Sequence, residues 1–60
     1  MGEKIKILRE KAGLSQKQLA ARLGIDQSAV ARWESGENIP ATNRIIPLAE
    51  ALGCSPGDLF

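Results

Sequence analysis

Polar side chains recur at helical spacing between residues 27 and 35, and the chemistry they offer is hydrogen bonding. An α-helix over this segment would present on one side the residues at i, i+1, i+4, i+5 and i+8, which are Gln27, Ser28, Ala31, Arg32 and Ser35. In the major groove of DNA an arginine donates two hydrogen bonds to guanine, a glutamine pairs with adenine, and an alanine contacts the methyl group of thymine. Because most exposed helix faces are polar, this set alone leaves a DNA-recognition surface and an ordinary solvated surface equally open.

Catalytic and metal-binding side chains are scarce in the chain. With one cysteine and no histidine, the sequence excludes an internal disulfide and a zinc site built from Cys and His. The serines lack the histidine base of a nucleophilic triad, and no glycine-rich phosphate-binding motif is present. We therefore expect no enzyme activity, no cofactor and no metal.

The length of 60 residues corresponds to one domain, residues 1–60. A domain of this size buries only about 60% of the surface that its unfolded chain exposes, so little is left for a deep pocket. No apolar run approaches the ~20 residues that span a membrane, and no secretory signal follows Met1. We expect a cytoplasmic protein with no membrane partner, in which Cys54 is a reduced, buried and inert thiol.

The charge of the chain is unevenly distributed, although its net value is only +1. Residues 4–32 contain seven basic and two acidic side chains, whereas residues 33–60 contain four acidic side chains and one basic side chain. The basic half could meet a polyanion. Scattered lysines and arginines also simply solvate helices, and the modest clustering favours that interpretation when charge is considered alone.

Glycines and prolines divide the chain into short segments, and each segment has helical rather than alternating periodicity. The expected helices cover Glu3–Ala12, Gln16–Leu23, Gln27–Ser35, a stretch within Ala41–Leu52, and a last short segment that starts at Ser55. No segment has the pattern of a strand. These elements predict an all-α fold, a compact bundle of about five short helices.

The ends of these segments carry capping residues. Ser15 and Gln18 match a capping box, and Asp26 is expected to cap the following helix. Pro47 is awkward within its segment, because it lacks an N–H and its ring clashes with the carbonyl four residues earlier, at Asn43. The helix must therefore start late, near Thr42 or Asn43, or kink at Pro47, and we favour the late start.

A helix-turn-helix is indicated by small and apolar residues at fixed spacing. Ala20 allows two helices to approach closely, Gly24 supplies the flexible position of the turn, and Val30 packs the second helix back onto the first. Trp33 lies on the same inner side as Val30. Its spacing favours a core position over a platform on which a base could stack.

The stretch from Leu14 to Gly36, LSQKQLAARLGIDQSAVARWESG, continues to Pro40 and the sequence AEALG at residues 49–53. Together with Arg9, this pattern resembles the phage repressor and Cro-like (XRE-type) helix-turn-helix family over nearly the whole chain. The resemblance implies a lambda-repressor-like DNA-binding domain.

Functional roles for individual residues follow from this resemblance by position. It implies base contacts by Gln27, Ser28 and Arg32, and phosphate contacts by Ser15, Gln16, Ser35 and Asn38. It also implies that Gln16 orients Gln27, and that Arg9 and Glu34 form an internal salt bridge, for which a bidentate arginine–carboxylate geometry is well suited. Ser28 and Ala31 are short, and the loop of residues 37–40 carries an acid and no base. Both departures predict modest affinity or a greater dependence on DNA shape.

The expected function is therefore that of a transcriptional regulator that binds double-stranded DNA, and a repressor is the favoured kind. Such domains bind paired half-sites as symmetric dimers, and Ile46, Leu59 and Phe60 are candidates for the surface of a homodimer. An antitoxin or a restriction-system controller with the same domain and a further protein partner is an alternative. A protein-interaction module that keeps the fold without DNA binding is another.

Overall fold

The computed structural model describes residues 1–60 and consists of four α-helices followed by one 3-10 turn, with no strand. The elements are α1 (Gly2–Lys11), α2 (Gln16–Leu23), α3 (Gln27–Ser35), α4 (Thr42–Leu52) and η1 (Pro56–Leu59). The predicted all-helical fold is confirmed, and α2 and α3 have the bounds expected from the sequence. None of the helices is both long and apolar enough to cross a lipid bilayer.

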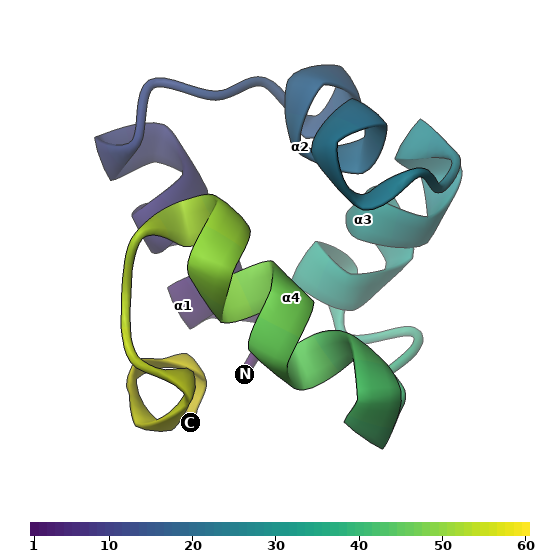
Figure 1. Ribbon diagram of the computed structural model, residues 1–60. Helices are drawn as coiled ribbons and strands as arrows, with labels where there is room; N and C mark the ends of the chain where they lie inside the picture. Colours follow the sequence, from purple (N-terminus) through teal and green to yellow (C-terminus); the bar gives the residue numbers. More distant parts are fainter.

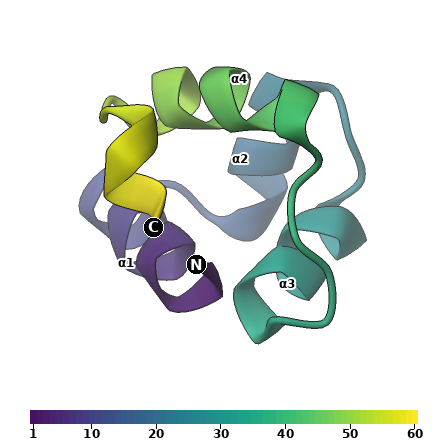
Figure 2. The same cartoon turned by 90° about the horizontal axis from the view of Figure 1, so that it is seen from below.

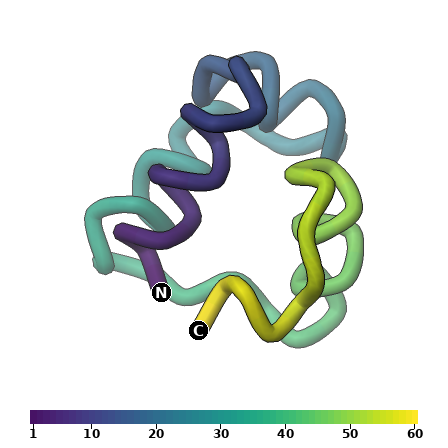
Figure 3. The backbone as a smooth tube through the Cα atoms, turned by 90° about the vertical axis from the view of Figure 1, so that its left-hand side faces the viewer, coloured from purple at the N-terminus to yellow at the C-terminus, as the bar shows by residue number.

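The helices pack as a bundle around one core (Figure 1). Helix α3 contacts both α1 and α2, while α4 contacts α2 and η1. Figure 2 shows α4 crossing α2, with η1 beside one end of α4 and against α1. The two ends of the chain lie close together, as the backbone trace in Figure 3 shows. The contacts of η1 with α1 and α4 close the bundle on this side.

The core draws at least one side chain from every element. Its members are Ile5, Leu19, Ala20, Val30, Trp33, Leu48, Ala49, Leu52 and Leu59. The predicted core positions of the helix-turn-helix, Ala20, Val30 and Trp33, are all buried. Leu59 is fully buried, so its expected place on a dimer surface is wrong: η1 turns this side chain inward to close the core. Ile46 and Phe60 are 61% and 66% exposed.

The turn between α2 and α3 is built on Gly24. This residue has φ 68° and its N–H donates to the carbonyls of Ala20 and Ala21, which ends α2 in a left-handed cap. Ser15 starts the same helix with the predicted capping box, in which Ser15 Oγ accepts from the Gln18 N–H at 3.0 Å. Asp26 occupies the N-cap position of α3, but the expected side-chain hydrogen bond is absent. The start of α3 therefore lacks the side-chain hydrogen bond that caps α2 at Ser15.

Pro47 lies inside α4 and does not end it. The helix begins at Thr42, as favoured from the sequence, yet this late start makes Pro47 the sixth helical residue rather than part of the first turn. Because proline has no backbone N–H, the carbonyl of Asn43 has no hydrogen-bond donor within the helix. Because Asn43 and Pro47 are both exposed, water can satisfy this carbonyl.

Gly2 permits the close approach of α1 to the end of α3, a contact that the sequence did not reveal. A Cβ atom at this position would clash with the carbonyl oxygens of Trp33 and Glu34. The absence of a side chain therefore lets the start of α1 lie directly against the last turn of α3. Helix α1 begins at Gly2, one residue earlier than expected.

Replacing Gly24 by valine is expected to lower the free energy of unfolding by about 1–3 kcal/mol, because a β-branched residue is strained at positive φ. No atom lies within 4 Å of a Cβ built at Gly24, so the strain arises from the backbone alone. Thermal and urea unfolding followed by circular dichroism will measure it. Gly57→Val is the matched control, since Gly57 has equally open space and no positive φ. Equal stability of the two variants would contradict the proposed origin of the strain.

Candidate nucleic-acid interface

The outward side of α3 presents the polar residues that were singled out in the sequence. Gln27, Ser28 and Ser35 are exposed and Arg32 is half-buried. On the opposite side of the helix, Val30 is fully buried and Trp33 is only 8% exposed. The indole of Trp33 therefore belongs to the core and offers no platform for stacking a base.

An ion pair between α1 and α3 anchors this helix. Arg9 Nε donates to Glu34 Oε2 at 2.6 Å and Arg9 Nη2 donates to Glu34 Oε1 at 3.2 Å, so the predicted pair is present and bidentate. The two side chains are only 10% and 5% exposed. The third guanidinium nitrogen, Nη1, donates to the carbonyl of Leu14 at 2.7 Å. Arg9 thus holds α1, the loop before α2 and the end of α3 in one arrangement.

Two glutamines extend this contact to the surface. Gln16 Nε2 donates to Glu34 Oε1 at 3.0 Å, and Gln27 Nε2 donates to Gln16 Oε1 at 3.0 Å. The structure therefore joins Gln16 to Gln27, as the family resemblance implied. It also links Gln16 to Glu34, which the sequence did not suggest.

The loop after α3 folds back onto the helix. The backbone N–H of Asn38 donates to the carbonyl of Arg32 at 3.2 Å. With the Asn38 amide oxygen facing Arg32, that oxygen accepts from Arg32 Nε at 3.3 Å. Ser35 Oγ donates to the Arg32 carbonyl at 3.1 Å and accepts from the Glu37 N–H at 3.3 Å. The Ser35 hydroxyl is therefore occupied within the turn, whereas Ser15 Oγ accepts one bond at its cap and keeps its proton free for another partner.

The electrostatics of the site centre on Glu34. Burial disfavours its charged form, but the hydrogen bonds from Arg9 and Gln16 and the attraction of Arg9 and Lys6 outweigh burial, so the pKa of Glu34 lies below its ordinary value. The same hydrogen bond raises the pKa of Arg9, so it favours the charged form of both partners. Both groups are charged at neutral pH.

The single thiol lies away from this network. Cys54 is half-buried rather than fully buried as expected, and it packs against the core. Burial, followed by the nearby Asp58 carboxylate, raises the pKa of this thiol. The thiol is thus protonated at neutral pH and a poor nucleophile.

Acidification is expected to remove the stabilisation contributed by the Arg9–Glu34 pair. The pKa of Glu34 is lowered in the folded state, so this stabilisation is complete above the ordinary value of 4.5 and disappears as the pH falls further, through the folded-state pKa. Melting temperatures measured from pH 7 to pH 3 will show the decline. Glu34→Gln should flatten this part of the profile, whereas Glu3→Gln at an exposed position should not. A Glu34→Gln profile with the same acid slope as wild type would contradict this assignment.

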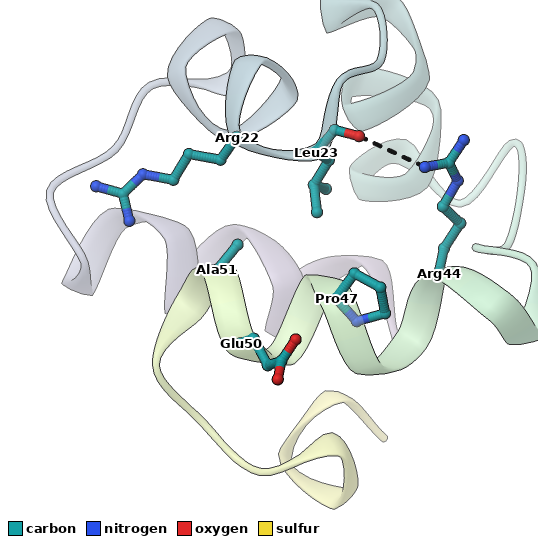
Figure 4. A pocket seen from close by; sticks show the side chains of 6 residues that line it. All are labelled: Arg22, Leu23, Arg44, Pro47, Glu50 and Ala51. Carbon is teal, nitrogen blue, oxygen red and sulfur yellow. Dashed lines mark hydrogen bonds between the residues drawn. The ribbon is translucent and has the colours of Figure 1, made fainter.

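The surface has two shallow depressions, and neither contains paired catalytic groups. One, of about 260 Å³, is lined by Lys4, Ile7, Leu8 and Asp58. The other, of about 630 Å³, lies between α2 and α4 and is lined by Arg22, Leu23, Arg44, Pro47, Glu50 and Ala51 (Figure 4). In Figure 4 the guanidinium of Arg44 turns toward the end of α2, where it donates to the Leu23 carbonyl at 3.5 Å, while Arg22 extends away from it. Arg44 therefore ties α4 to α2.

Two helices joined by a glycine turn, the second with a buried inner side and a polar outer side, define a helix-turn-helix protein. The helix-turn-helix family model matches residues 5–59, and the chain belongs to this family. The XRE-type assignment made from the sequence motifs is confirmed by the similarity to phage repressors.

Among curated proteins, the chain is 36% identical to Repressor protein C2 of Salmonella phage P22, over 100% of this chain and 28% of the repressor. It is 34% identical to the HTH-type transcriptional regulator DicA of Escherichia coli, over 93% of this chain and 42% of DicA. The chain thus spans less than half the length of either relative.

Solved structures show the same fold. The P22 c2 repressor in complex with a synthetic operator superimposes with a TM-score of 0.91 at 34% identity, over 98% of this chain and 89% of that chain. The restriction-modification controller protein C.AhdI from Aeromonas hydrophila also gives a TM-score of 0.91, at 39% identity and with the same coverage of 98% and 89%.

Proposed function

We propose that this chain binds double-stranded DNA by inserting α3 into the major groove, and that it serves as a transcriptional regulator, acting as a repressor. The observation that carries the proposal is the polar outer side of α3, held in place by the ion pair and the two glutamines. The similarity to a repressor whose structure was solved with its operator supports it. In this proposal residues 1–60 form one DNA-binding domain, with no cofactor and no enzymatic role.

The proposed base contacts are made by Gln27, Ser28 and Arg32, and those to phosphates by Ser15, Gln16, Ser35 and Asn38. The short side chain of Ser28 leaves most direct recognition to Gln27 and Arg32. The contact with the Asn38 amide uses only Arg32 Nε, which leaves both terminal NH2 groups of Arg32 free for guanine. Ser35 must release its bond to the Arg32 carbonyl before it can donate to a phosphate. This exchange and the acid at Glu37 favour modest affinity.

A homodimer on paired half-sites is part of the same proposal, because a module this small makes few contacts alone. Ile46 and Phe60 are exposed apolar residues that a second copy could cover. We place this regulator in the cytoplasm, where DNA is accessible to it.

Selection from a random duplex library at low salt, followed by titration of the enriched duplex at two salt concentrations, tests the proposal. We expect an enriched palindrome and an affinity that falls steeply with salt, since phosphate contacts release counterions. Absence of enrichment, with only weak and salt-sensitive binding, would overturn it and favour a protein-interaction module.

A restriction-system controller is the second candidate, and the identity of 39% to C.AhdI, against 34% to the P22 c2 repressor structure, favours it. Controllers and repressors share this domain, so the domain alone does not distinguish them. The position of the enriched duplex sequence in the genome does. A match upstream of a methyltransferase or endonuclease reading frame would support the controller. A toxin reading frame beside the gene would instead indicate an antitoxin with a protein partner.

A further inference from the structure

A continuous line of hydrogen bonds connects the buried ion pair to the side chain at the start of α3. It runs from Arg9 to Glu34 (2.6 Å), from Glu34 to Gln16 (3.0 Å) and from Gln16 to Gln27 (3.0 Å). Exposure increases along this line, from the nearly covered Glu34 side chain through half-buried Gln16 to exposed Gln27. The interior of the domain is therefore in direct contact with the proposed recognition surface.

The direction of these bonds follows from the charge of Glu34. An ionised carboxylate only accepts hydrogen bonds, whereas a glutamine amide has one end that accepts and one end that donates. Gln16 must therefore direct its NH2 group to Glu34. In this orientation the Oε1 atom of Gln16 faces Gln27. Gln27 must in turn donate with Nε2, as observed. One negative charge thus sets the orientation of two successive amides.

We propose that Glu34 is a positioning residue for base recognition, which through Gln16 makes Gln27 present its carbonyl oxygen and one free N–H to the major groove. This inference rests on the proposed DNA binding. An acceptor beside a donor matches adenine, which offers the N6 amino group and the N7 acceptor. Gln27 turned the other way would present two N–H groups, which match the O6 and N7 acceptors of guanine.

Glu34→Gln tests the proposal because it replaces the carboxylate with an amide of the same shape. We expect the amide oxygen to keep the short contact with Arg9 Nε, so that the new NH2 group takes the place of Oε1 and faces Gln16. The 3.2 Å bond from Arg9 Nη2 to Oε1 is then lost, because an NH2 group cannot accept it. Gln16 then turns its oxygen to residue 34 and its NH2 group to Gln27, so the line of bonds reverses. In duplex selection we expect the ratio of adenine to guanine at the Gln27 base pair to fall at least about tenfold. The preference at the Arg32 base pair is the internal control and should not change.

Gln16→Met provides a second test that leaves the ion pair intact, in case Glu34→Gln destabilises the fold. Without its partner Gln27 can turn either way, so its preference for adenine over guanine should weaken without reversing. Nuclear magnetic resonance of the free protein offers a readout that needs no DNA. The side-chain NH2 resonances of Gln27 should shift in both variants, because the bond to Gln16 is lost or reversed.

The outcomes separate this inference from the proposed function. If the wild-type protein selects no duplex, both fail. If it selects one, and neither variant changes the adenine-to-guanine ratio at the Gln27 base pair, the role of Glu34 alone is overturned. A uniform loss of affinity with unchanged base preference would show that Glu34 is structural only.

Discussion

Replacing Arg9 by methionine is expected to cost the folded domain about 3–5 kcal/mol, because it leaves the Glu34 carboxylate buried without its partner. The carbonyl of Leu14 loses its donor in the same substitution. Small domains have free energies of unfolding near the lower end of about 5–15 kcal/mol, so this loss should leave a large fraction of the molecules unfolded at 37 °C. Urea unfolding followed by circular dichroism will measure the change.

Arg22→Met is the matched control for this experiment, since Arg22 is exposed and makes no salt bridge. Surface substitutions of this kind usually change stability by about 0.5 kcal/mol or less. The double variant Arg9→Met with Glu34→Met should recover much of the lost stability, because two apolar side chains can replace a buried ion pair at little cost. If Arg9→Met unfolds like wild type, the ion pair does not hold α1 to α3.

The parts of the fold that depend on neighbouring residues were predicted well. Ser15 with Gln18, and Gly24 after Leu23, specify the start and end of α2 through local hydrogen bonds and a local φ. Helical periodicity likewise placed Val30 and Trp33 in the core. Such features need only a few residues of context, so a single sequence reveals them.

Features that depend on distant packing were predicted less well. Pro47 is tolerated inside α4 because Asn43 faces solvent, and Leu59 is buried because η1 closes the bundle. Gly2 matters only because the end of α3 lies against it. Asp26 loses its expected capping bond although its position is correct. For Leu59 and Gly2 the deciding contacts lie elsewhere in the fold, and the exposure of Asn43 depends on how α4 packs. Nothing in the structure explains why Asp26 makes no capping bond.

The candidate site divides in the same way. The polar side of α3 follows from spacing, and the pairing of Arg9 with Glu34 was implied by the family resemblance. The bond from Gln16 to Glu34 joins residues 18 positions apart. Many polar side chains lie at a similar distance from Gln16 along the sequence. Only the way in which α2 and α3 cross brings Glu34, rather than another of them, within hydrogen-bond distance. The bond between Gln16 and Glu34 therefore could not be predicted without the structure, whereas the contact between Gln16 and Gln27 was implied by the family resemblance.

Reversing the charge of Arg32 should have the largest effect on DNA binding. Arg32→Glu removes a proposed bidentate contact, which is worth about 1–3 kcal/mol, and places a carboxylate among the phosphates of the duplex. We expect affinity for the selected duplex to fall by about 100-fold or more, which corresponds to about 3 kcal/mol. Fluorescence anisotropy at constant salt will measure it, with circular dichroism to verify that the variant is folded.

Arg22→Glu makes the same change of two charge units at a different place and is the matched control. Arg22 lies in the depression between α2 and α4 rather than on the outer side of α3 (Figure 4). Its substitution should weaken binding only through the general loss of positive charge, and this smaller effect should fade as salt screens it. The effect of Arg32→Glu should persist at higher salt, because it includes a lost contact with a base. Equal losses for both variants at every salt concentration would mean that binding depends on net charge alone, and α3 would then not be the recognition helix.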